Sequence, residues 1–190
     1  FTPLINKVEE LSGKKYTGIL EDEKDIAIRV VVDHIRAVVF AIADGQLPSN
    51  GGAGYVIRRI LRRGISYAYR FLGMKEAFLY ELVAILKNEM GGFFPELVKQ
   101  EKLVTEVIRE EEISFLKTIE HGLKRIDLVI NETISKNQKT LPGAAVFELY
   151  DTYGFPADLS RIIAEEKQLT VDEEGFEEEM NLSLIHISEP

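Results

Sequence analysis

Apolar residues recur at helical spacing along most of the chain, and glycine, proline or short polar turns separate the runs. This pattern predicts a series of helices, over residues 4–12, from Asp22 or Asp25 to about 43, 54–72, 75–90, 95–137, 143–154 and 158–167. No segment of useful length alternates apolar and polar residues as a half-buried strand does. The predicted fold class is all-α.

Two of the predicted helices have patterns of their own. The helix ending near residue 43 is apolar nearly all round in its middle, which is typical of a buried helix. Between Pro95 and Asn137 there is no further proline and a single glycine, Gly122, so this segment could form one helix of ~60 Å. We expect this long helix to be the central element of the fold.

Composition limits the function classes. The net charge is -9. The chain has no cysteine, which excludes disulfides and thiolate metal sites. The absence of cysteine also fits a reducing compartment, so we expect a cytoplasmic protein. No apolar run is long enough to span a membrane. The chain begins with Phe1 and not methionine, so we expect a fragment of a longer protein. The last ten residues, 181–190, change composition abruptly, and we expect a non-native or disordered tail.

A basic helix stands out on this acidic chain. From Tyr55 to Lys75 there are five arginines and one lysine and no acid. Four of them form two pairs spaced four apart, which places them on one helix surface: Arg58, Arg59, Arg62 and Arg63. Guanidinium groups bind phosphates as forks, so the pattern predicts a site for a polyanion. The alternative is a solvated face in which some arginines pair with acids at 110–112.

Two further segments carry candidate chemistry. The loop at 48–54, PSNGGAG, is no Walker loop, and its glycines are typical of tight turns, but the Asn50 amide could read a base edge. The segment at 149–156, LYDTYGFP, combines aromatic residues with Asp151, whose carboxylate could accept from an exocyclic amine. The alternative, which the pattern favours, is a helix end whose aromatic residues pack in the core.

No catalytic constellation emerges from the sequence. Asp33 and His34 lie in an apolar helix without a nucleophile, and a core histidine with satisfied hydrogen bonds is the better interpretation. His121 and His186 are isolated, and no spacing of histidine and acids predicts a metal site. We therefore predict no catalytic residue and no metal ligand in this chain.

Two segments in order, RVVVDHIRAVVFAIADGQLPSNGGAGYVIRRILRR at 29–63 and FELYDTYGFPADL at 147–159, resemble the alanyl-tRNA synthetase family. The resemblance extends over residues 1 to about 180. It implies that residues 1–20 are the end of the catalytic core and a connector, and that 21–180 form a helical tRNA-recognition domain. The chain would then begin immediately after the catalytic motifs.

The resemblance also implies roles for single residues. Asn50 and Asp151 match the residues with which the family reads the G·U wobble pair in the acceptor stem of tRNA(Ala). The arginine-rich helix would hold neighbouring phosphates through Arg58, Arg59, Arg62 and Arg63. The family's usual arginine at the third position after the asparagine is replaced here by Ala53, so one RNA contact is absent if that arginine makes one.

The family's cofactors and other domains would lie outside this chain. The resemblance implies ATP with Mg²⁺ in the catalytic core and zinc in an editing domain, and no cofactor in this fragment. The fragment alone is predicted to be inactive in alanine activation, with the catalytic and editing domains and tRNA(Ala) as its partners. Two alternatives remain open, a helical protein-interaction scaffold and a non-specific RNA-binding module.

Overall fold

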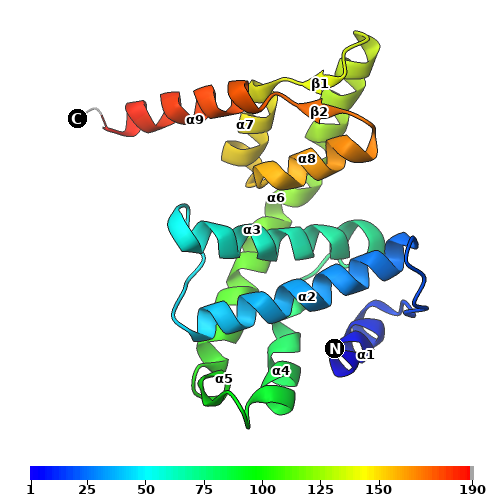
Figure 1. Ribbon diagram of the computed structural model, residues 1–190, viewed down its shortest axis with the longest axis vertical. Coiled ribbons are helices and arrows are strands. Elements are labelled where there is room, and N and C mark those ends of the chain that lie inside the picture. The colour runs from blue at the N-terminus through cyan, green and yellow to red at the C-terminus, as the bar shows by residue number, and fades with distance from the viewer. Residues whose placement is uncertain (189–190) are drawn as a thin grey trace. The chain divides into compact units, whose positions relative to one another are not determined.

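The computed structural model of the chain describes residues 1–188 (Figure 1). These residues form two compact units, Phe1–Leu116 and the part from Lys117 onward. The described residues are mostly helical, which confirms the predicted fold class, and the longest element, α6 (Glu101–Ser135), contains the boundary between the units.

The first unit is built around α2, as its apolar pattern predicted. Helix α2 packs against α1, α3, α4 and α5, and its buried side chains include Ile28, Ile35 and Ile42. The elements of this unit before α6 are α1 (Thr2–Ser12), α2 (Glu23–Ala43), α3 (Gly52–Tyr67), the π-helical η1 (Ala68–Leu72), the 3-10 turn η2 (Leu79–Glu81), α4 (Leu82–Met90) and α5 (Pro95–Lys99).

Single residues account for several helix ends, and these ends lie close to the bounds that the sequence predicted. The Asp22 carboxylate caps α2 by accepting from the backbone N–H of Asp25 at 3.0 Å. Gly13 ends α1 with φ 68°, and Gly73 ends η1 with φ 72°. Glycine adopts this left-handed conformation without the steric cost that a Cβ would bring.

The connector before α2 is held by a buried carboxylate. Asp25 accepts from the backbone N–H and the hydroxyl of Thr17 and from the backbone N–H of Ile19. Burial raises the pKa of Asp25, but these hydrogen bonds and Lys24 outweigh it and lower the pKa to about 2. The connector is therefore fixed against the first turn of α2.

Two helix predictions need correction. The segment 95–137 is interrupted at Gln100, whose φ of -103° and ψ of 4° separate α5 from α6. The helix predicted to begin at 75 begins only at Leu79, as η2. The buried Glu112 carboxylate of α6 determines that start, since it accepts from the backbone N–H groups of Phe78 and Leu79. This partner lies more than 30 residues away in the chain, so the local pattern gave no sign of it.

The second unit continues α6 and adds β1 (Thr140–Leu141), α7 (Gly143–Tyr153), α8 (Ala157–Glu166), β2 (Thr170–Val171) and α9 (Glu173–Ser188). The two strands pair in parallel, with Thr140 opposite Thr170. Two residues are too few to show an alternating pattern, so the sequence did not predict them. Helix α9 passes close to α7, where a Cβ on Gly143 would collide with the backbone of Gly175 and Phe176.

The predicted tail at 181–190 mostly falls within α9, which continues to Ser188. Residues 189–190 lie outside the described residues. The non-native origin of this segment and the domain bounds 1–20 and 21–180 stay predictions.

The environment of Glu112 makes the stability of the first unit depend on pH. The pKa of Glu112 is raised to about 7, because the effect of burial is larger than that of the hydrogen bonds from the backbone N–H groups of Leu79, Phe78 and Tyr80, which lower the pKa. In the unfolded chain the same group releases its proton near pH 4.5. The unfolded state therefore binds fewer protons between these values, and the stability that Glu112 contributes is lost as the pH rises from 4.5 through 7.

We expect Glu112→Gln to remove this part of the pH dependence. A shift of this size corresponds to about 3 kcal/mol of unfolding free energy between pH 4.5 and 8. Urea unfolding followed by circular dichroism, on both proteins at each pH, gives the difference directly. The difference between the two unfolding free energies should change by about 3 kcal/mol over this pH range, because only the original protein loses stability there. A difference that stays constant would refute the shift.

Candidate functional site

Asn50 lies on an exposed loop that packs closely on the start of α3. The Ser49 hydroxyl donates to the Gly51 carbonyl oxygen at 2.8 Å. A Cβ on Gly54 would collide with the Leu47 carbonyl oxygen and with Ser49 Oγ, and Gly52 has φ 59°. The interpretation of these glycines as residues that permit tight turns and close approach therefore holds.

Arg58 joins Asn50 to an acid on α6. Its Nε lies 3.2 Å from both carboxylate oxygens of Glu111, and its Nη2 lies 2.7 Å from Oε1. Its Nη1 donates to the Asn50 side-chain oxygen. The side chains of Arg58 and Glu111 are only 21% and 14% exposed, so this network is fixed more firmly than a surface ion pair.

The other three arginines of the predicted site have different surroundings. Arg62 Nη2 lies 3.5 Å from Glu111 Oε2, and its guanidinium lies 5.1 Å from the Phe115 ring centroid. Arg63 lies over the Tyr67 ring, and Arg59 is partly buried. The pairing with acids at 110–112, raised as the alternative, is thus present for Arg58 and Arg62, and Glu111 is the acid involved.

Asp151 lies in the last turn of α7, and its side chain is exposed. Among the described residues no hydrogen bond or ion pair reaches its carboxylate. A negative charge near a helix C-terminus interacts unfavourably with the helix dipole. Asp151 therefore does not stabilise its own helix, which makes it a candidate for binding a hydrogen-bond donor from outside.

The segment after Asp151 is held by α6. The Thr118 hydroxyl donates to the Tyr153 carbonyl oxygen at 2.9 Å. The buried Phe155 ring lies against Gly122, where any Cβ would collide with it. Core packing of the aromatic segment, the alternative that its pattern favoured, is thus correct for Phe155. Sequence reasoning did not assign these roles to Thr118 and Gly122, although Gly122 is the one glycine in the long helical segment.

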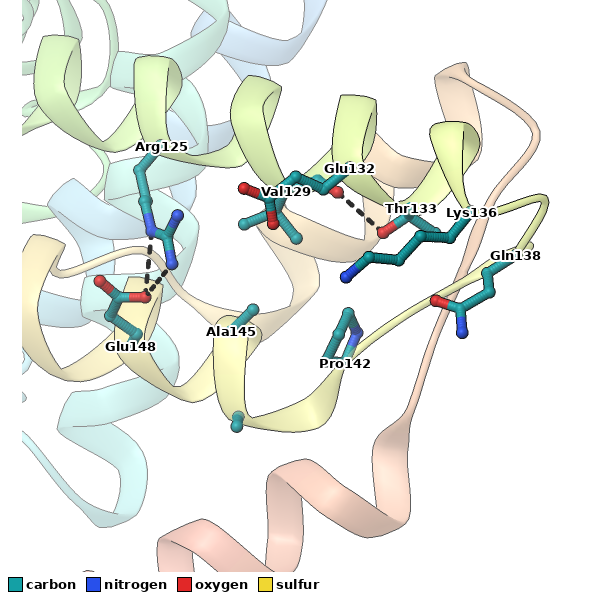
Figure 2. A pocket seen from close by; sticks show the side chains of 10 residues that line it. Arg125, Val129, Glu132, Thr133, Lys136, Gln138, Pro142, Ala145 and Glu148 are labelled. Atoms are coloured by element: carbon teal, nitrogen blue, oxygen red, sulfur yellow. Dashed lines mark hydrogen bonds and ion pairs between the residues drawn. The ribbon is translucent and has the colours of Figure 1, made fainter.

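A hollow of about 310 Å³ lies beside the first turns of α7 (Figure 2). Arg125 donates to Glu148 Oε2 from Nε at 3.0 Å and from Nη2 at 2.8 Å, and Glu148 in turn raises the pKa of Arg125. Glu132 and Lys136 add one charge of each sign. The lining charges therefore cancel, and none of the predicted site residues lies there. Glu148 has a cation as its partner, in contrast to Asp151 one turn later.

The remaining candidates from the sequence, the Asp33–His34 pair and a metal site, do not form a functional site among the described residues. The His34 ring lies 3.4 Å from the Asp33 carboxylate beside a buried helix face, and no nucleophile was predicted there. Among the described residues, no group of three or more histidine, cysteine or acidic side chains could hold a metal ion. None of the helices in the described part of the chain combines the length and the hydrophobicity that a membrane-spanning helix needs.

The structure thus joins Asn50, Arg58, Arg62 and Glu111 within the first unit, and it places Asp151 in the second. Ala53, which replaces the arginine expected from the family, is exposed in the first turn of α3. The acid that organises the arginines, Glu111, was one of three candidates in the sequence. Only the rotation of α6 distinguishes it from its neighbours.

The chain matches known proteins over nearly its whole length. The family described as tRNA synthetases class II (A) matches residues 1–185. The alanine–tRNA ligase of Flavobacterium psychrophilum is 58% identical over an alignment of 183 positions, and the alignment covers 93% of this chain and 20% of that protein. Those of Cytophaga hutchinsonii and Porphyromonas gingivalis are 54% and 50% identical over 180 residues, 95% of this chain and 20% of each protein. The chain therefore spans about 20% of the length of these relatives.

Proposed function

The chain belongs to the family of class II tRNA synthetases, and we propose that it is the part of an alanine–tRNA ligase that recognises the acceptor stem of tRNA(Ala). The parent enzyme would use ATP to attach alanine to the tRNA in the cytoplasm. Its catalytic domain, with ATP and Mg²⁺, and its editing domain, with zinc, would lie outside this chain. By itself the chain would bind the stem without activating alanine.

The exposed Asp151 carboxylate is the observation that carries this proposal. It has no partner among the described residues and gains nothing from the α7 dipole. In the wide, shallow minor groove of an RNA helix, guanine presents an exocyclic amine. Wobble pairing leaves this amine without a partner base, so a carboxylate can accept from it. Asn50 would contact the same G·U pair with its amide.

The arginines of α3 would hold the RNA backbone beside these contacts. Contacts to phosphates position a stem, and contacts to bases specify it. Arg58 and Arg62 both contact the Glu111 carboxylate, at 2.7 Å and 3.5 Å. Arg59 and Arg63 extend the basic surface along the same helix.

The experiment that tests the proposal compares two RNA hairpins that differ only in carrying G·U or G·C at one position. We expect the chain to bind the G·U hairpin more tightly by about 1–3 kcal/mol. The affinity for both should fall steeply as salt rises, because phosphate contacts release counterions. Fluorescence anisotropy over a range of salt concentrations measures both effects.

The two alternatives predict other results. A protein-interaction scaffold would bind neither hairpin. That result would overturn the proposal. A non-specific RNA-binding module would keep the salt dependence and bind both hairpins equally, which would refute base reading but keep phosphate binding.

A further inference from the structure

We propose that Glu111 is a positioning residue for base-pair recognition, which acts by fixing Arg58 and through it the amide of Asn50. This inference rests on the proposed function and adds a residue to which neither the motif nor the resemblance gives a role. The three side chains form one chain of contacts within the first unit, from α6 through α3 to the loop.

The guanidinium transmits orientation because it is planar and rigid. Glu111 holds Arg58 by Nε and Nη2, with the shortest contact at 2.7 Å to Oε1. Two donors on one carboxylate fix the plane of the group and leave Nη1 directed at the loop. Nη1 then donates to Asn50 Oδ1. A lysine at position 58 could not hold both partners in a fixed plane, because its ammonium acts as a point charge.

This contact decides which face of the Asn50 amide remains for a ligand. Arginine has only donors, so the atom facing Arg58 must be the amide oxygen. The amide nitrogen, with its two N–H groups, then points away from Arg58 on an exposed side chain. Asn50 would therefore donate to an acceptor in the minor groove, such as a base nitrogen, a base carbonyl oxygen or a ribose hydroxyl, while Asp151 accepts.

Glu111 could act on RNA binding in two ways, by neutralising the arginines or by positioning Asn50, and the two roles predict different results for Glu111→Gln. The substitution removes a negative charge from between Arg58 and Arg62. If Glu111 only neutralised these arginines, its loss would strengthen phosphate binding to every RNA and leave the preference for G·U unchanged. If Glu111 positions Asn50, the preference should fall, whatever happens to the overall affinity.

The test measures the ratio of affinities for the G·U and G·C hairpins with the 190-residue chain and its variants. Glu110→Gln is the matched control, because it removes the same charge one position earlier on α6 from an exposed side chain. We expect Glu111→Gln and Arg58→Lys each to reduce the ratio at least threefold, and Glu110→Gln to leave it unchanged. A ratio that Glu111→Gln leaves intact overturns the inference.

Asn50→Ala separates this inference from the proposed function. If Asn50→Ala lowers the ratio and Glu111→Gln does not, base reading stands and the positioning role is wrong. If Asn50→Ala leaves the ratio unchanged, Asn50 does not read the pair and both statements fail for this residue. In the absence of RNA, Glu111→Gln must also shift the side-chain amide resonances of Asn50 in an NMR spectrum, whereas Glu110→Gln must not. Unshifted resonances contradict the contact chain independently of any RNA.

Discussion

Glu112→Ala is expected to lower the unfolding free energy of the first unit by about 3–5 kcal/mol. The carboxylate is 1% exposed and accepts from three backbone N–H groups, at 3.0 Å from Phe78, 2.9 Å from Leu79 and 3.1 Å from Tyr80. Alanine leaves these donors without an acceptor where Phe78 and Leu79 are buried. Each unsatisfied buried donor costs roughly 1–3 kcal/mol, and relief from burying the carboxyl group offsets part of this sum.

Two further variants should lose less stability than Glu112→Ala. Glu112→Gln keeps one acceptor oxygen but places an N–H against a donor, so its loss should lie between that of alanine and zero. Glu110→Ala changes an exposed residue on the same helix and should stay within about 0.5 kcal/mol of the original protein. Urea unfolding at pH 6 measures all three. Hydrogen exchange at the amides of 78–80 should accelerate in the alanine variant, and unchanged exchange there would contradict the assigned role of Glu112.

Local signals in the sequence were sufficient for most of the helices. The sequence offered Asp22 or Asp25 as the cap of α2, and the structure uses Asp22. The helical runs predicted to end at residues 12 and 72 do end there, where Gly13 and Gly73 adopt the left-handed conformation. The late helix start at Leu79 could not be predicted, because its acceptor, Glu112, comes from α6. The two-residue strands likewise depend on pairing between 140 and 170, and not on any pattern within either.

The candidate site shows the same division between local and long-range information. Four arginines at helical spacing predicted a basic surface, and three consecutive acids at 110–112 were possible partners. Successive residues on a helix point about 100° apart, so each of the three acids has its own environment. Glu110 is exposed, Glu111 pairs with Arg58 and Arg62, and Glu112 is buried. The rotation of α6 that makes this choice is fixed by the buried residues about one turn away on either side, Ile108 and Phe115.

Asp151→Ala is expected to abolish most of the preference for the G·U hairpin, a loss of about 1–3 kcal/mol, while the affinity for the G·C hairpin stays the same or rises. The carboxylate is the proposed acceptor for the guanine amine, and alanine removes that acceptor alone. The stability of the second unit should not fall. It should rise by about 0.3–1 kcal/mol, because the substitution removes a negative charge from the C-terminal end of α7.

Loss of recognition together with a gain in stability distinguishes a binding residue from a structural one. Asp127→Ala is the matched control, since it removes the same charge from an exposed side chain of the second unit. Any general effect of a less negative protein on RNA affinity will therefore occur in both variants, and only Asp151→Ala should change the ratio between the hairpins. Anisotropy titrations and thermal unfolding of the two variants measure the two effects separately.

If Asp151→Ala keeps the ratio, base reading by this carboxylate is wrong. If it destabilises the unit by more than 1 kcal/mol, Asp151 has a structural role, and its exposed position and free carboxylate would need another explanation.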